Sequence, residues 1–192
     1  TAPQLYLLPL DGGEPQRLTS VATGVAQPKW FPDGTRIAFL SRVWADLDTS
    51  AKQAERLKER TDAKMQAQVW DGSPVRAWDT WVDDRELHVF AVGVAGGEPE
   101  ALTQGSGLQL PRNAVQGTDG HFAISPDGRE LAFVADSDSA INDSDNDVFT
   151  VAIAADGSVS CQVDAGTNAF VQGGNAFGGT AALGTSDNNA LD

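Results

Sequence analysis

Two short phrases each occur twice in this 192-residue chain, and they constrain its fold more than any other feature. The first phrase joins a Pro-Asp-Gly turn to a strand ending in Ala-Phe, at residues 29–40 and again at 123–134. The second combines an apolar strand, Gly-Gly-Glu-Pro and Leu-Thr, at residues 5–19 and 87–103. An eroded copy begins at Asp147. Repeated hairpins that cannot bury their apolar faces singly must stack, which favours a β-propeller.

Short apolar segments bounded by Gly, Pro and Asp predict strands at 4–10, 36–41, 86–94, 130–135 and 147–153. Residues 48–68 interrupt this pattern, because they contain no Gly or Pro and are rich in Ala, Lys, Glu, Arg and Gln. We expect a surface helix inserted between blade strands there, capped by Asp48, Thr49 or Ser50. Its apolar residues form only a thin stripe (Leu47, Ala51, Ala54, Leu57, Thr61 and Met65). Such a helix is either a solvated insertion or a partner-docking element.

The fold class is therefore all-β: a partial β-propeller of about three blades with one inserted surface helix. Residues 1–156 are expected to form the propeller, and the Gly- and Asn-rich residues 157–192 a β or disordered tail. An open array of blades exposes unpaired edge strands, so self-association through these edges is expected.

The net charge of −14 restricts the partners of the chain. An acidic surface repels nucleic acid and anionic membranes, so neither is expected as a partner. No apolar run reaches the roughly 20 residues of a membrane span. The single cysteine, Cys161, excludes an internal disulfide and leaves the compartment open.

Residues 76–90, which contain Trp78-Asp79-Thr80-Trp81, add a more specific pattern to the repeats. Together these motifs resemble the N-terminal propeller of the prolyl oligopeptidase family, in its bacterial acylaminoacyl-peptidase-like branch, over residues 4–155. The Pro-Asp-Gly repeat is also shared with TolB-like propellers. The family resemblance implies a soluble bacterial protein of the cytoplasm or periplasm, in which a propeller caps a C-terminal α/β-hydrolase domain that cleaves short peptides. Residues 168–190 resemble instead a segment of phage tail-fibre proteins.

A serine nucleophile of that family sits in a Gly-x-Ser-x-Gly turn, and the sequence contains none. Ser106 lacks both glycines, and residues 184–188 lack the second one. Neither His88 nor His121 completes a triad, and each is expected to be structural. The expected function is thus the non-catalytic, substrate-gating part of a serine peptidase. The alternatives are a TolB-like binding or scaffold module and a structural, tail-fibre-like chimeric surface protein.

Four residues are candidates for substrate gating: Arg76, Trp78, Trp81 and Arg85. The family resemblance implies that the inner loops of the propeller help to admit substrate, so the two arginines would meet a peptide carboxylate. The competing interpretation makes them structural ion pairs. Trp30, Trp44 and Trp70 are expected mainly to fill space between sheets, whereas Trp78 and Trp81 are exceptions because charged residues surround them.

Asp143, Asp145 and Asp147 invite comparison with a calcium loop, because hard cations prefer clustered carboxylate oxygens. The spacing departs from an EF-hand loop, since Val148 stands where the turn glycine belongs. A solvated loop between strands is therefore the favoured interpretation, and no metal or other cofactor is expected.

Overall fold

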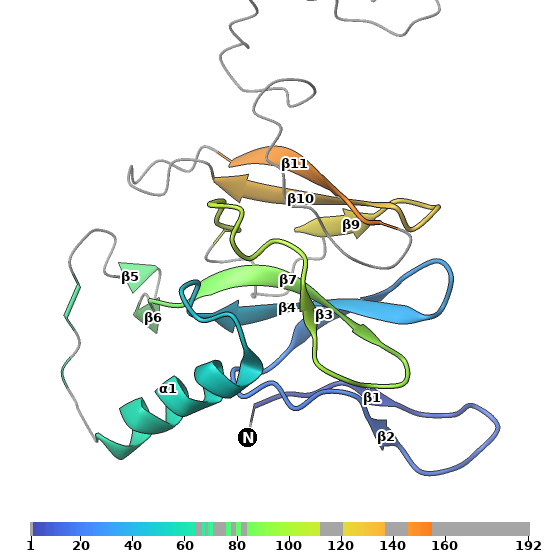
Figure 1. The fold of residues 1–192 in the computed structure, drawn as a ribbon, viewed down its shortest axis with the longest axis horizontal. Helices are drawn as coiled ribbons and strands as arrows, with labels where there is room; N and C mark the ends of the chain where they lie inside the picture. The colour runs from blue at the N-terminus through green and yellow to red at the C-terminus, as the bar shows by residue number, and fades with distance from the viewer. Residues whose placement is uncertain are drawn as a thin grey trace, which may run out of the picture.

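The computed structural model describes residues 2–63, 67, 69–70, 76–77, 80–81, 84–111, 121–136 and 146–154. The strands are β1 (Tyr6–Leu7), β2 (Gln16–Arg17), β3 (Ala26–Trp30), β4 (Arg36–Val43), β5 (Arg76–Ala77), β6 (Thr80–Trp81), β7 (Glu86–Gly93), β8 (Glu100–Ala101), β9 (Phe122–Ile124), β10 (Glu130–Asp136) and β11 (Asn146–Ala152). One helix, α1 (Ser50–Asp62), lies between β4 and β5 (Figure 1). The described part of the chain is mostly β with a single helix, as the sequence predicted.

All strand pairs are antiparallel, and two sheets dominate. The central sheet has the order β3-β4-β7-β8, and a second sheet has the order β11-β10-β9. β1 pairs only with β2, and β5 only with β6, among the described residues. The β4–β7 pairing runs from Arg36 opposite Gly93 to Val43 opposite Glu86 without a register shift. The central sheet is thus a complete four-stranded meander.

The central sheet is covered on both faces (Figure 1). One apolar cluster joins it to the β9–β11 sheet and includes Leu40, Val89 and Leu131, each 0% exposed. A second cluster joins its other face to the β1–β2 ladder and includes Phe39 and Leu5. Alternate strand residues serve the two clusters, because successive side chains point to opposite faces. Three sheets stacked in chain order are the arrangement of consecutive propeller blades.

The two Pro-Asp-Gly phrases form the same turn, one at the β3–β4 junction and one at the β9–β10 junction. Gly34 and Gly128 adopt φ angles of 69° and 71°, a region that favours glycine. The Asp33 carboxylate accepts a hydrogen bond from the Thr35 amide, which holds the pKa of Asp33 below its usual value. The Asp127 pKa is lowered in the same way, first by its hydrogen bond to the Ser125 hydroxyl.

The second repeated phrase is also real, but its strand alignment differs from the expected one. The expected match of Leu5 with Leu87 is wrong by two residues. Leu5 instead matches Val89, because each donates its amide to a threonine hydroxyl at the end of its phrase, at 2.9 Å for Thr19 and 3.0 Å for Thr103. Each residue of the second copy is then numbered 84 higher than its counterpart in the first copy, from the strand to Leu-Thr.

The helix α1 was expected as a surface insertion with a cap at residues 48–50, and both expectations are confirmed. The Thr49 side chain caps α1 by accepting from the Lys52 amide at 3.4 Å. The thin apolar stripe does not supply the packing contact of the helix, because Ala51 and Ala54 are exposed while Gln53 is buried. No helix in the described ranges is long and apolar enough to cross a membrane.

Trp44 is 3% exposed, as core packing predicts, whereas Trp30 and Trp81 are 54% and 58% exposed. The space-filling prediction is therefore wrong for Trp30, whereas the exposure of Trp81 agrees with its exception from that prediction. Trp78, Cys161, Asp143, Asp145 and the tail 157–192 lie outside the described residues.

Candidate functional site: the insertion between β4 and β7

Residues 44–85 leave the central sheet after β4 and return to it at β7 (Figure 1). In an antiparallel meander the β3–β4 and β7–β8 turns share one end of the sheet, and the β4–β7 connection lies at the other. This insertion therefore projects from the end opposite the Pro-Asp-Gly turn, and it carries the predicted gating residues.

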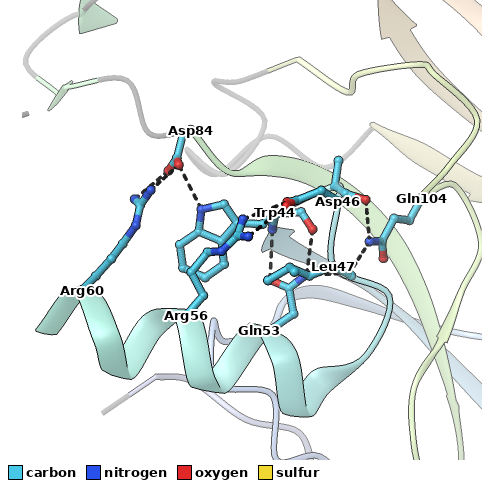
Figure 2. Close-up of polar contacts among 9 residues, drawn as sticks. Trp44, Asp46, Leu47, Gln53, Arg56, Arg60, Asp84 and Gln104 are labelled. Carbon is cyan, nitrogen blue, oxygen red and sulfur yellow. Dashed lines mark hydrogen bonds and ion pairs between the residues drawn. The ribbon is translucent and has the colours of Figure 1, made fainter. Parts of the chain in front are cut away.

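Trp44 is the centre of the contacts that hold α1 (Figure 2). Its indole N–H donates to Asp84 Oδ2 at 3.1 Å, and the same carboxylate is paired with Arg60 of the helix. Three guanidinium groups surround the indole ring, with Arg60, Arg85 and Arg56 at 5.0, 5.5 and 5.7 Å from its centroid. Such contacts stabilise an aromatic ring through its negative face. Charged side chains thus make most of the contacts that join α1 to Trp44.

Hydrogen bonds of Gln53 hold α1 in place where an apolar contact would be expected. Its side-chain oxygen accepts from the Trp44 amide at 3.0 Å, and its Nε2 donates to the Trp44 and Leu47 carbonyls at 2.8 and 2.9 Å. Gln104, which follows β8, donates to the Leu47 carbonyl at 2.7 Å and to the Ala45 carbonyl at 3.3 Å (Figure 2). The backbone between β4 and α1 is therefore tied to both the helix and the central sheet.

Two exposed ion pairs border this region. Arg56 donates to both carboxylate oxygens of Asp46 at 2.9 Å, and Lys52 donates to Asp48 at 2.7 Å. The Arg56 hydrogen bond lowers the pKa of Asp46, and the Lys52 hydrogen bond lowers that of Asp48. Exposed ion pairs contribute little to stability individually.

Asp46→Asn should loosen α1 in a pH-dependent way. Because the folded-state pKa of Asp46 is lowered, the pair with Arg56 is fully formed above the ordinary value of 3.8 and is lost as the pH falls below it. We expect D46N to lower the hydrogen-exchange protection of α1 at pH 7, with the difference from wild type shrinking as the pH falls below 3.8 and vanishing below the lowered folded-state pKa of Asp46. D33N is the control, because Asp33 lies in the turn at the opposite end of the sheet. A difference that persists at low pH would contradict this role of the carboxylate.

The structure brings together two of the four predicted gating residues. Arg76 and Trp81 are partners across the β5–β6 ladder, with the guanidinium 5.9 Å from the indole centroid. Trp70 lies beside them, its ring centroid 5.3 Å from that of Trp81. Arg85 lies instead against Trp44, and Trp78 is outside the described residues.

Sequence reasoning missed the polar face of α1. Gln53, Arg56 and Arg60 recur at three- and four-residue intervals, so they share one side of a helix. That spacing is visible in the sequence, but polar residues are not counted when a helix is inspected for an apolar stripe.

A pocket that is partly open to solvent lies between the start of α1 and the central sheet. Phe39, Phe90 and Val43 contribute apolar lining, and Thr23 and Gln104 contribute hydroxyl and amide groups. At the start of α1, the Ser50 amide donates to the Glu98 carboxylate at 3.0 Å. The Ser50 amide at the helix N-terminus thus already has a hydrogen-bond partner within the chain.

Asp147 does not lie in a solvated loop, so that prediction is wrong for this residue. It is 8% exposed and sits in β11 opposite Ala135. Repeat geometry places it at the position of His88, which is 1% exposed and contacts Thr103 Oγ1 and Glu86 Oε2, each at 3.2 Å. His88 is buried and has two side-chain partners, which is typical of a structural histidine. Within the described ranges no three His, Cys, Asp or Glu residues cluster as metal ligands would.

Known proteins place these features in a wider context. No family model matches the chain. Over 134 residues, 70% of its length, it is 30% identical to the "Uncharacterized peptidase YuxL" of Bacillus subtilis (strain 168). The chain resembles part of a peptidase. It spans only 18% of that relative's length.

Solved structures similar to the chain include TolB proteins. TolB from Acinetobacter baumannii is 17% identical with a TM-score of 0.41, covering 86% of this chain and 28% of that one. The putative TolB from Agrobacterium tumefaciens is 21% identical with a TM-score of 0.35, covering 82% and 39%. The likeness of the tail to fibre proteins stays a prediction.

Proposed function

We propose that this chain is the non-catalytic, substrate-gating propeller portion of a prolyl-oligopeptidase-like serine peptidase. The observation that carries the proposal is its 30% identity to a peptidase over 70% of its length. The stacked meander sheets and the lack of a Gly-x-Ser-x-Gly turn in the sequence support it. Its partners are a peptide substrate and the C-terminal hydrolase domain of the parent protein.

The gating role rests on Arg76 and Trp81. Both are exposed, and together they place a cation and an apolar ring side by side on the insertion. A peptide ending in a free carboxylate would pair with the guanidinium, while an apolar side chain packs against the indoles of Trp81 and Trp70. Arg85, seated against Trp44, acts by positioning the start of β7.

Peptide binding tests the proposal. We expect short apolar peptides with a free C-terminus to change the tryptophan fluorescence of the full chain, and C-terminal amides to bind more weakly. Arg76→Ala should weaken binding of the free acids about tenfold, the loss of one charge-assisted contact, and leave the amides unchanged. Arg129→Ala is the matched control, because Arg129 is exposed in the distant Pro-Asp-Gly turn.

Equal binding of acids and amides by wild type and R76A would contradict gating by this residue. A fluorophosphonate probe should leave the chain unlabelled, and specific labelling would overturn the non-catalytic assignment. Capture of a folded protein without peptide binding would favour a scaffold module. A cross-linked trimer dependent on residues 165–192 would favour a tail-fibre-like structural protein.

A further inference from the structure

Among the described residues, the two outermost sheets of the stack each expose apolar side chains on their outer face. The β1 face consists of Tyr6, Leu8 and Leu10, which are 57%, 62% and 103% exposed. The β11 face consists of Val148, which is 59% exposed, with exposed Thr150 and half-buried Ala132 and Val134. The internal repeat shows what such faces contact elsewhere in the same molecule.

The β1 face has a buried counterpart in the central sheet. With the constant shift of 84 residues, Tyr6 and Leu8 match Phe90 and Val92. Phe90 and Val92 are only 9% and 2% exposed, because they pack against the preceding β1–β2 layer. The β1 face is therefore the kind of face that a preceding blade covers.

The β11 face corresponds to the other face of the central sheet. Pairing of Phe133 with Phe149 matches that of Phe39 with Phe90, which places Val148 at the position of Val89. By the same register Val134 matches Leu40. Val89 and Leu40 are 0% exposed, because the following sheet, β9–β11, covers them.

The stack has two internal junctions between sheets. At each of them, a face that corresponds to the β11 face packs on a face that corresponds to the β1 face. We propose that a second copy of this chain repeats that junction, with the β1 face of one copy packed on the β11 face of the next. The contact is head-to-tail and continues an interface already present twice within the chain. Such heterologous contacts make rings or filaments rather than closed two-fold dimers.

Charge opposes this association. The chain carries a net charge of −14, so copies repel each other at low ionic strength. Added salt screens the repulsion and strengthens apolar burial, so association should rise with salt concentration. Association through surface ion pairs would instead decrease with salt concentration.

Sedimentation velocity of the full chain tests the proposal. We expect species larger than the monomer that increase with protein and salt concentration. Leu8→Glu and Val148→Glu should each remain monomeric, because each lacks one of the two faces. An equimolar mixture should form a heterodimer that grows no further, since only one intact pair of faces remains. Val69→Glu is the control: Val69 is 88% exposed and belongs to neither face.

Three results would overturn the proposal. A wild-type chain that stays monomeric at all concentrations and salt levels would show that these faces do not pair. Association of V148E alone would indicate a symmetric contact through the β1 face. Association of L8E and V148E as strong as that of wild type would indicate pairing through strand edges instead. Because Leu8 and Val148 lie outside the insertion that carries Arg76 and Trp81, peptide binding by L8E and V148E tests the gating proposal separately.

Discussion

Phe39→Ala is expected to lower the free energy of unfolding by about 3–5 kcal/mol, the range for truncating a fully buried phenylalanine. Phe39 is 0% exposed and its ring stacks on Phe90, with centroids 5.9 Å apart. It lies in the middle layer of the stack, where no neighbouring strand can collapse into the cavity without leaving its own sheet. Because a domain of this kind has only about 5–15 kcal/mol in total, the loss is a large part of its stability.

Urea denaturation followed by circular dichroism measures this effect. Phe149→Ala is the matched control, because Phe149 occupies the position of Phe90 in the outer sheet and is only partly buried, 6.0 Å from Phe133. We expect a loss of about 1–2 kcal/mol there, since less surface leaves water. Equal losses at the two sites would contradict the layered core.

Gln53→Ala should release α1 from the sheet before the rest of the molecule unfolds. The substitution leaves the Trp44 amide without its partner, whereas the Trp44 carbonyl keeps the Leu47 amide, and a buried unsatisfied polar group costs about 1–3 kcal/mol. Undocking of α1 lets water reach these groups and limits the loss, so we expect about 2–3 kcal/mol in all. Hydrogen exchange should show lower protection in α1 and unchanged protection in β4 and β7.

Lys58→Ala is the control for Gln53, because Lys58 lies on the same helix, is exposed and pairs with Asp62 one turn away. Its removal should change stability by less than about 0.5 kcal/mol. If K58A and Q53A had the same effect, helix propensity rather than the Trp44 contacts would hold α1 in place.

Local features were predictable because each depends on neighbouring residues. Pro-Asp-Gly dictates its turn through a fixed proline φ and a glycine at positive φ, and both copies adopt it. The N-cap of α1 was predictable for the same reason, since Thr49 needs only the amide three residues later. The insertion between β4 and β7 followed from its composition.

Register was not predictable in the same way. A shift of two residues keeps every side chain on its original face, so matching Leu5 to Leu87 or to Val89 preserves the apolar alternation equally well. The hydrogen bonds from the strands to Thr19 and Thr103 and the registers of the two ladders decide for Val89. The same 84-residue shift separates the two Gly-Gly-Glu-Pro phrases in the sequence.

The sequence by itself determined an all-β chain of repeated hairpins with one helical insertion, because turns, caps and alternation are local properties. Tertiary structure decided which faces are buried. Gln53 is buried and Trp81 exposed because burial depends on what lies opposite: Trp44 and its backbone for Gln53, and solvent for Trp81. Identical alternation leaves Val89 covered and Val148 open, since only the stacking of sheets distinguishes a middle layer from an outer one.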